Sequence, residues 1–167
     1  MTIRQARPDD HTALVILWRR AGLTPDIGDD LASFAWAVTH FGAHYWVLTD
    51  DAGRILGSVL AAFDGRRGWI HHLAVDPVHQ RQGFGKRLMA RAEQSLRDAG
   101  CPKINLLIEP HNRGVQVFYE GLGFQAASNL FMEKVLAPLG PMQNSPSTGG
   151  HDGARNAGSG SAPEPPD

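Results

Sequence analysis

The stretch HHLAVDPVHQRQGFGKRLM, residues 71–89, decides how this chain folds. An apolar run ends in Asp-Pro, a loop with the pattern Q-x-x-G-x-G (residues 80–85) follows, and an amphipathic helix begins directly after it. Two glycines at the start of a helix leave backbone N–H groups bare and let a phosphate approach closely. The helix dipole, Lys86 and Arg87 add positive charge at the same point. The stretch therefore predicts a site for a diphosphate.

Two common phosphate-binding loops do not fit this pattern. A Walker A loop is excluded because Gln80 stands where its first glycine belongs and Arg87 where its hydroxyl residue belongs. A dinucleotide fingerprint is excluded because Leu88 stands where a third glycine or alanine is needed. The remaining pattern, Q-x-x-G-x-G after L-A-V-D-P, resembles the acyl-CoA loop of the GNAT superfamily of N-acetyltransferases.

Two further stretches strengthen this resemblance. NRGVQVFYEGLGF (residues 112–124) is similar to the superfamily's ending N-x-x-x-x-x-x-Y-E-x-x-G-F, and GCPKINLLIE (residues 100–109) precedes it as an apolar strand. The three motifs occur in the expected order over residues 1 to about 136. Together they resemble the small, stand-alone bacterial members of the superfamily.

The pattern of apolar residues predicts an α/β layered domain. Helices are expected over about residues 10–21, 30–40 and 84–99, and a short one is expected to be capped by Asn112. Strands are expected at residues 3–6, 45–49, 55–63, 69–75, 103–108 and from about 123 to 135. The GNAT resemblance implies a mixed central sheet of about six or seven strands, flanked by about four helices, with two splayed parallel strands in the middle.

Composition limits the remaining possibilities. Residues 1–136 are expected to form the GNAT domain, and residues 137–167, rich in Gly, Pro and Ser, a disordered tail. A net charge of −1 gives no footprint for nucleic acid or a membrane surface, and no stretch is apolar enough to span a bilayer. The single cysteine, Cys101, fits a cytoplasmic protein. No spacing of ligands predicts a metal site.

The resemblance implies acetyl-CoA as co-substrate and places it. The strands over residues 69–75 and 103–108 would run parallel and then separate, and the pantetheine arm would lie between them. Asn112 would bind the pantetheine, and Tyr119, on the same helical face, would approach the thioester sulfur. The full set of residues implied to bind the co-substrate is Leu73, Ala74, Val75, Gln80, Arg81, Gln82, Gly83, Phe84, Gly85, Lys86, Asn112 and Tyr119.

Amide formation makes three demands on the site. A backbone N–H near Leu73 is the family's expected donor to the oxyanion, and Tyr119 suits the acid that protonates the departing thiolate. The attacking amine must lose a proton, because an alkylammonium has a pKa of about 10.4. Strand alternation allows only one of His71 and His72 to face the substrate, and His72 is the preferred base. A chain of water molecules serves equally well, and the further candidates are Asp64, His79 and Glu109.

The sequence thus predicts direct acetyl transfer, in a ternary complex, to an amine on a small molecule, peptide or protein. The acceptor side is expected over residues 23–44, where Phe34, Trp36 and Phe41 suggest an apolar or mixed pocket. No carboxylate cluster is evident there, which argues against polyamines. A non-catalytic acyl-CoA sensor on the same fold and transfer of a larger acyl group are the alternatives. The oligomeric state is left open between monomer and homodimer.

Overall fold

The computed structural model describes residues 1–136, and the tail predicted over residues 137–167 lies outside the described residues. Residues Met1–Ala126 form one compact unit, which holds every described helix and strand. Residues Ala127–Asp167 form a second unit, of which residues 127–136 are described and contain no helix or strand.

The elements of the first unit follow the predicted order closely. The strands are β1 (Thr2–Gln5), β2 (Tyr45–Thr49), β3 (Ile55–Phe63), β4 (Gly68–Val75) and β5 (Ile104–Leu106). The α-helices are α1 (His11–Arg20), α2 (Leu31–Phe41), α3 (Phe84–Asp98) and α4 (Gln116–Glu120). Short 3-10 helices fill the connections: η1 (Pro8–Asp10), η2 (Gly42–His44), η3 (Pro77–His79) and η4 (Pro110–Val115).

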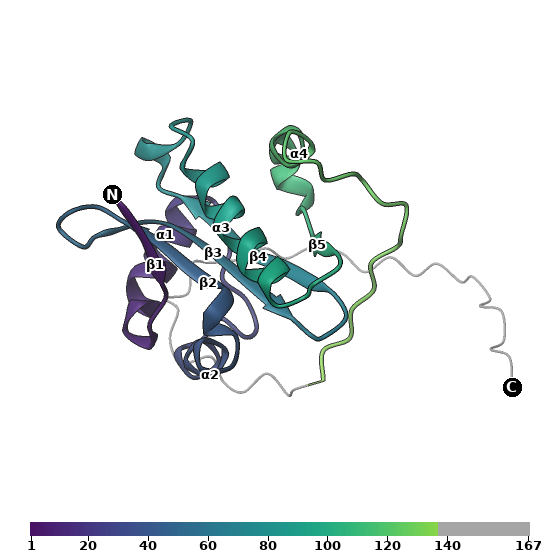
Figure 1. Cartoon of the computed structure of the whole chain (residues 1–167), viewed down its shortest axis with the longest axis horizontal. Helices are drawn as coiled ribbons and strands as arrows, with labels where there is room; N and C mark the ends of the chain where they lie inside the picture. The colour runs from purple at the N-terminus through teal and green to yellow at the C-terminus, as the bar shows by residue number, and fades with distance from the viewer. Residues whose placement is uncertain (137–167) are drawn as a thin grey trace, which may run out of the picture. The chain divides into compact units, whose positions relative to one another are not determined.

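Helices cover both faces of one mixed sheet with the strand order β1-β2-β3-β4-β5. Neighbours from β1 to β4 are antiparallel, and β5 runs parallel to β4. In β2, Trp46 and Leu48 pack in the core beneath α3, while Tyr45 and Val47 pack in the core beneath α1 and α2. Figure 1 shows α3 lying across the central strands. The predicted α/β layers and about four α-helices are confirmed.

Three details of the predicted sheet are wrong. The described sheet has five strands, where about six or seven were expected. The parallel pair β4–β5 lies at one edge of this sheet and not in its middle. The strand expected from about 123 to 135 is absent, because residues 124–136 form no described helix or strand. Apolar and β-branched residues fit a strand only when a neighbouring strand pairs with them, and composition does not reveal that neighbour.

Candidate active site

The parallel strands β4 and β5 separate after a short contact. Their pairing covers Gly68–Ile70 and Ile104–Leu106, whereas β4 continues to Val75. The backbone N–H of Asp76 donates to the carbonyl of Leu56 in β3 at 2.8 Å. Backbone direction alternates along a strand, so the N–H of Val75, next to Asp76, points away from β3, toward the edge beyond the pairing with β5. Ala74, the residue before it, pairs with Ser58 of β3. Within the described residues, β4 therefore has an unpaired edge at the place where the pantetheine arm was expected.

The loop after β4 leads directly into the start of α3. The backbone turns through positive φ angles at Arg81 (58°) and Gly83 (82°). Gly83 is the N-cap and has no side chain to cap the helix, and the first helical hydrogen bond runs from the N–H of Arg87 to the carbonyl of Gly83. The N–H groups of residues 84–86 therefore have no partner within the helix. They form the positive end of a 15-residue helix dipole.

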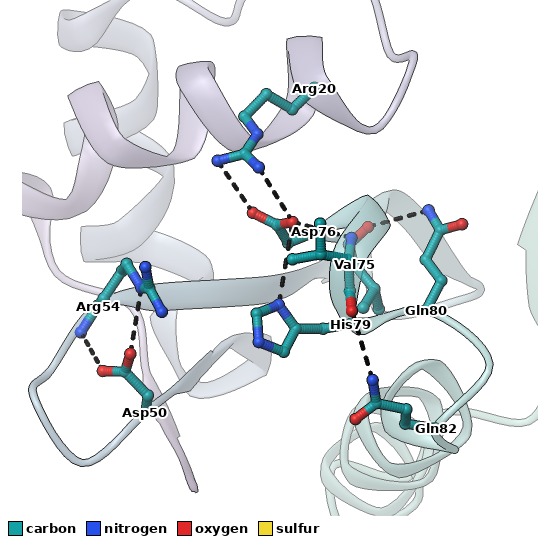
Figure 2. Close-up of polar contacts among 9 residues, drawn as sticks. Arg20, Asp50, Arg54, Val75, Asp76, His79, Gln80 and Gln82 are labelled. Atoms are coloured by element: carbon teal, nitrogen blue, oxygen red, sulfur yellow. Dashed lines mark hydrogen bonds and ion pairs between the residues drawn. The ribbon is translucent and has the colours of Figure 1, made fainter.

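The two glutamines of the loop hold its shape from inside. The Gln80 side-chain amide donates to the carbonyl of Val75 at 3.0 Å, and that of Gln82 to the carbonyl of Val78 at 3.4 Å (Figure 2). Gln80 thus binds the end of β4, and Gln82 binds a backbone carbonyl within the loop. The neighbouring Lys86 is exposed, whereas the ring of Phe84 is buried and leaves only its backbone available.

A buried carboxylate anchors this loop to the rest of the sheet. Asp76 is 6% exposed and lies 3.2 Å from both terminal nitrogens of Arg20 on α1. It also accepts a hydrogen bond from the N–H of Val78 at the start of η3, as Figure 2 shows. The sequence pattern predicted only the end of a strand at Asp76. An Asp-Pro pair between a strand and a loop was the signal available, because aspartate commonly caps the turn that follows it.

A cavity of about 580 Å³ opens beside the separated strands, in the size range typical of small-molecule sites. The lining residues come from the segment between α1 and α2, from α2 itself, from β2, β3 and β4, and from the start of η4. They are Leu23, Thr24, Asp26, Ile27, Gly28, Asp29, Phe34, Ala37, Tyr45, Leu60, His71, His72, Glu109, His111 and Asn112.

The two neighbouring histidines of β4 both line this cavity, which corrects the prediction that only one of them could. The register between β3 and β4 shifts between Ser58 and Leu60, where β4 carries an extra residue, and His72 adopts a positive φ of 49°. Such a β-bulge breaks the alternation of a regular strand and redirects a side chain. The prediction assumed unbroken alternation.

Hydrogen bonds on both sides hold His72 in this unusual conformation. The buried Ser58 hydroxyl donates to the His72 carbonyl at 2.9 Å and accepts the Trp18 indole N–H at 3.0 Å. The imidazole lies against the Trp18 ring, with centroids 4.1 Å apart, and its Nε2 is 3.1 Å from Asp29 Oδ2. Its Nδ1 is buried and has no hydrogen-bond partner within the described residues. Ser58 and Asp29 were not among the residues predicted for the site.

These contacts determine which side chains of the cavity are charged at neutral pH. Burial alone would raise the pKa of Asp29, but hydrogen bonds from His72 and from the N–H of Asp26 lower it below its usual range. Asp29 is therefore ionised at neutral pH. In the hydrogen bond between the two side chains, His72 Nε2–H donates and the Asp29 carboxylate accepts. Desolvation, together with the neighbouring His72, lowers the pKa of His71, so that His71 is neutral at pH 7. His71 is also exposed at the cavity.

The remaining base candidates separate into two groups. Glu109 lines the cavity. Asp64 lies in the turn between β3 and β4, where it accepts the N–H groups of Arg66 and Arg67. His79 lies in η3, with Nδ1 3.9 Å from Asp76. Neither Asp64 nor His79 lines the cavity.

Tyr119 lies in α4 among aromatic rings. Its ring centroid is 5.2 Å from that of Phe118 and 5.7 Å from that of Phe124, and it packs against the core beneath α3. Burial raises the pKa of Tyr119 to about 12, so its hydroxyl keeps its proton at neutral pH. Tyr119 is not among the residues that line the cavity.

Asn112 does not cap the helix that follows it, contrary to prediction. It lies within η4 at a kink (φ −109°, ψ 22°), and the N-cap of α4 is Val115. Asn112 and Tyr119 therefore belong to different helices and do not share one helical face. Asn112 does line the cavity, beside Glu109 and His111.

The acceptor-side aromatics are only partly as expected. Phe34 lines the cavity, whereas Trp36 is 56% exposed and stacks on His40 at 3.9 Å, and Phe41 packs against the core beneath α1 and α2. The argument against polyamines considered residues 23–44 alone, whereas Glu109, outside that segment, lines the same cavity as Asp26 and Asp29.

Within the described part of the chain, no three His, Cys, Asp or Glu side chains are placed to hold a metal ion. Over the same residues, no helix has the length and apolar character needed to cross a bilayer.

Comparison with known proteins assigns this architecture to a family. The sequence profile of the acetyltransferase (GNAT) family matches residues 11–124, more than half of the chain. The chain therefore belongs to the GNAT family of acetyltransferases, and it is an acyltransferase enzyme.

Individual relatives agree with this assignment. The chain is 30% identical over 132 residues to acetyltransferase SG1711 of Sodalis glossinidius, covering 79% of this chain and 92% of the relative. Its fold is similar to the ribosomal-protein-S18-alanine N-acetyltransferase of Escherichia coli, with a TM-score of 0.63, 26% identity and coverage of 76% and 79%. It is also similar to PaiA N-acetyltransferase of Thermoplasma acidophilum, solved in complex with coenzyme A, with a TM-score of 0.68, 15% identity and coverage of 77% and 91%. The last likeness concerns the fold alone.

Proposed function

We propose that this enzyme transfers an acetyl group from acetyl-CoA to a primary amine, on a small molecule or on a peptide or protein, by direct transfer in a ternary complex. The observation that carries the proposal is the continuity of two features: the edge of β4 beyond its pairing with β5, at Val75, leads directly to the bare N–H groups of residues 84–86. An extended pantetheine fits the first feature, and a diphosphate fits the second.

In this arrangement the loop backbone from Arg81 to Lys86 binds the diphosphate. Gln80 and Gln82 hold the loop in shape through their bonds to backbone carbonyls, and Lys86 adds charge. The N–H of Leu73 is proposed as donor to the carbonyl oxygen of the thioester as it becomes an oxyanion. Donors of this kind contribute about 3–4 kcal/mol to transition-state stability in comparable sites. Asn112, at the cavity wall, binds the pantetheine arm.

The reaction forms a C–N bond and breaks the C–S bond of the thioester. Tyr119 is proposed to donate to the departing sulfur. With its pKa raised to about 12, the hydroxyl is protonated when needed, and it stabilises the thiolate chiefly as a hydrogen-bond donor.

His72 is proposed to take the proton from the attacking amine. Asp29 orients its ring, as a carboxylate does in many acid–base pairs, and Nδ1 is left without a partner within the described residues. Because Nδ1 is buried, it can accept the proton only if the groups that cover it move or if a water molecule relays the proton from the amine. His71, neutral and exposed, is the second candidate because it needs no such shift.

Incubation with labelled acetyl-CoA and a pool of amines, peptides and cell extract tests the proposal, with products identified by mass. The expected result is an acetylated amine. Tyr119→Phe should leave acetyl-CoA affinity near that of the wild type and lower turnover. Tight co-substrate binding without transfer to any amine would support the non-catalytic sensor and contradict the proposal; equal turnover in Tyr119→Phe would remove Tyr119 as the acid. Cytoplasmic location and oligomeric state stay predictions from the sequence.

A further inference from the structure

The cavity combines acidic groups with an apolar wall. Asp26 and Asp29 come from the segment between α1 and α2, and Glu109 comes from the stretch between β5 and η4. Among the described residues that line the cavity, none is Lys or Arg. Aliphatic and aromatic side chains complete the lining: Leu23, Ile27, Phe34, Ala37, Tyr45 and Leu60.

Little within the described residues balances this negative charge. Asp29 is ionised and has His72 as partner. Asp26 and Glu109 are exposed at the cavity and have no ion-pair partner within residues 1–136. His71 is neutral at pH 7 and so contributes no positive charge. A ligand with a single ammonium group, which must become neutral to react, would leave the carboxylates of Asp26 and Glu109 without a cation.

We propose that the acceptor is a small aliphatic amine that carries a second cationic group. This inference rests on the proposed function and names its substrate class. The reacting amine lies at His71 and His72, the aliphatic chain lies along the apolar wall, and the second ammonium is received by Asp26 or Glu109. The second cation stays charged throughout the reaction, so its attraction to the carboxylates is not lost when the first amine is deprotonated. This reverses the expectation that the site disfavours polyamines.

Three acceptors of matched chain length test the proposal. 1,4-Diaminobutane has the second cation, 1-aminobutane lacks it, and 4-aminobutanoate replaces it with an anion. With saturating acetyl-CoA, kcat/KM is expected to be at least about tenfold higher for the diamine than for 1-aminobutane, and lowest for 4-aminobutanoate. The preference should shrink as salt rises, because exposed charges are screened.

Charge-removing variants locate the second cation. Asp26→Asn and Glu109→Gln are each expected to lower the ratio of kcat/KM for the diamine to kcat/KM for 1-aminobutane by about threefold to tenfold. Asp51→Asn is the matched control, because its carboxylate is 95% exposed and lies outside the cavity, paired with the N-terminus. It removes the same charge and should leave the preference unchanged.

Two results would overturn the inference: equal kcat/KM for the diamine and 1-aminobutane in the wild type, or an undiminished preference in the double variant Asp26→Asn/Glu109→Gln. Transfer to none of the three amines, with coenzyme A binding intact, would also overturn it and leave the proposed acetyltransferase activity to be sought with peptides. Failure to bind coenzyme A would instead contradict the proposed function itself.

Discussion

Ser58 is the residue on which the placement of both histidines depends. Its hydroxyl is fully buried between the Trp18 indole and the His72 carbonyl, and it satisfies both. A non-glycine residue with positive φ, such as His72 at 49°, costs on the order of 1–3 kcal/mol and persists only when its surroundings enforce it. The bulge therefore brings two imidazoles to one cavity at the expense of local backbone strain, a feature common at functional sites.

The histidine pair makes the first prediction. His72→Gln should lower kcat/KM by roughly 10²–10⁴-fold, the usual contribution of a general base, and His71→Gln by much less. The measurement is kcat/KM of both variants with a saturating concentration of acetyl-CoA. A large loss confined to His71→Gln would assign the base to His71 and contradict the proposal.

The two tyrosines of the chain give a prediction about pH. Burial raises the pKa of Tyr119 to about 12, and burial together with Asp29 raises the pKa of Tyr45. An unfolded tyrosine ionises near pH 10. Between pH 10 and 12 the unfolded chain therefore loses protons that the folded chain retains, and the free energy of unfolding falls as pH rises.

The raised pKa values of the two tyrosines are checked by an alkaline titration in which tyrosinate absorbance is measured. Little tyrosinate should form at pH 10 in the folded protein, whereas denatured protein should be about half ionised. Tyr119→Phe should remove the later-titrating signal. Half-ionisation of the folded protein at pH 10 would show that neither ring is buried as described.

At the scale of elements, the loop and α3 were predictable because their signal is local. Glycines, a preceding strand and an amphipathic helix all lie within residues 71–89, and local geometry follows from local sequence. The bulge at His72 was not predictable, because alternation supplies no sign that β4 holds one residue more than β3. Nor was the acidic cavity, because Glu109 is far from Asp26 in sequence and only the fold brings them together.

The contact between α3 and α4 carries the third prediction. A Cβ added to Gly85 would lie 3.3 Å from the Phe118 ring, whereas one added to Gly83 would meet nothing within 4 Å. A glycine is needed at position 83 because the backbone there has a positive φ. A glycine is needed at position 85 because a side chain there would collide with Phe118 of α4. Gly85→Ala should therefore displace Phe118 and its neighbour Tyr119, lowering kcat while the Kd for coenzyme A changes little.

A double-variant cycle with Phe118→Leu is the control, because a smaller side chain makes room for the added methyl group. In that background Gly85→Ala should cost less turnover than in the wild type. An equal loss of turnover in both backgrounds would mean that the contact with Phe118 is not its cause. A loss of coenzyme A affinity in Gly85→Ala would mean that the added methyl group, and not Phe118, disturbs the diphosphate site.

At the scale of the whole molecule, the family match ends at residue 124 and the compact unit at Ala126. We expect residues 1–136 to be sufficient for folding and catalysis. A chain truncated after residue 136 should unfold at nearly the same temperature as the full chain and retain its kcat/KM. Circular dichroism measures the unfolding temperature, and the transfer assay measures kcat/KM. A clear drop in either value would contradict the proposed domain boundary.

The central claim is that bare N–H groups at the start of α3 bind a diphosphate while the edge of β4 holds an extended arm. Isothermal titration calorimetry with coenzyme A and with pantetheine, which lacks the diphosphate, tests it most directly. Coenzyme A should bind saturably with one molecule per chain, and pantetheine should bind at least about a hundredfold more weakly, a difference of about 2.7 kcal/mol. No heat of binding with coenzyme A, or equal affinity for the two ligands, would contradict the account.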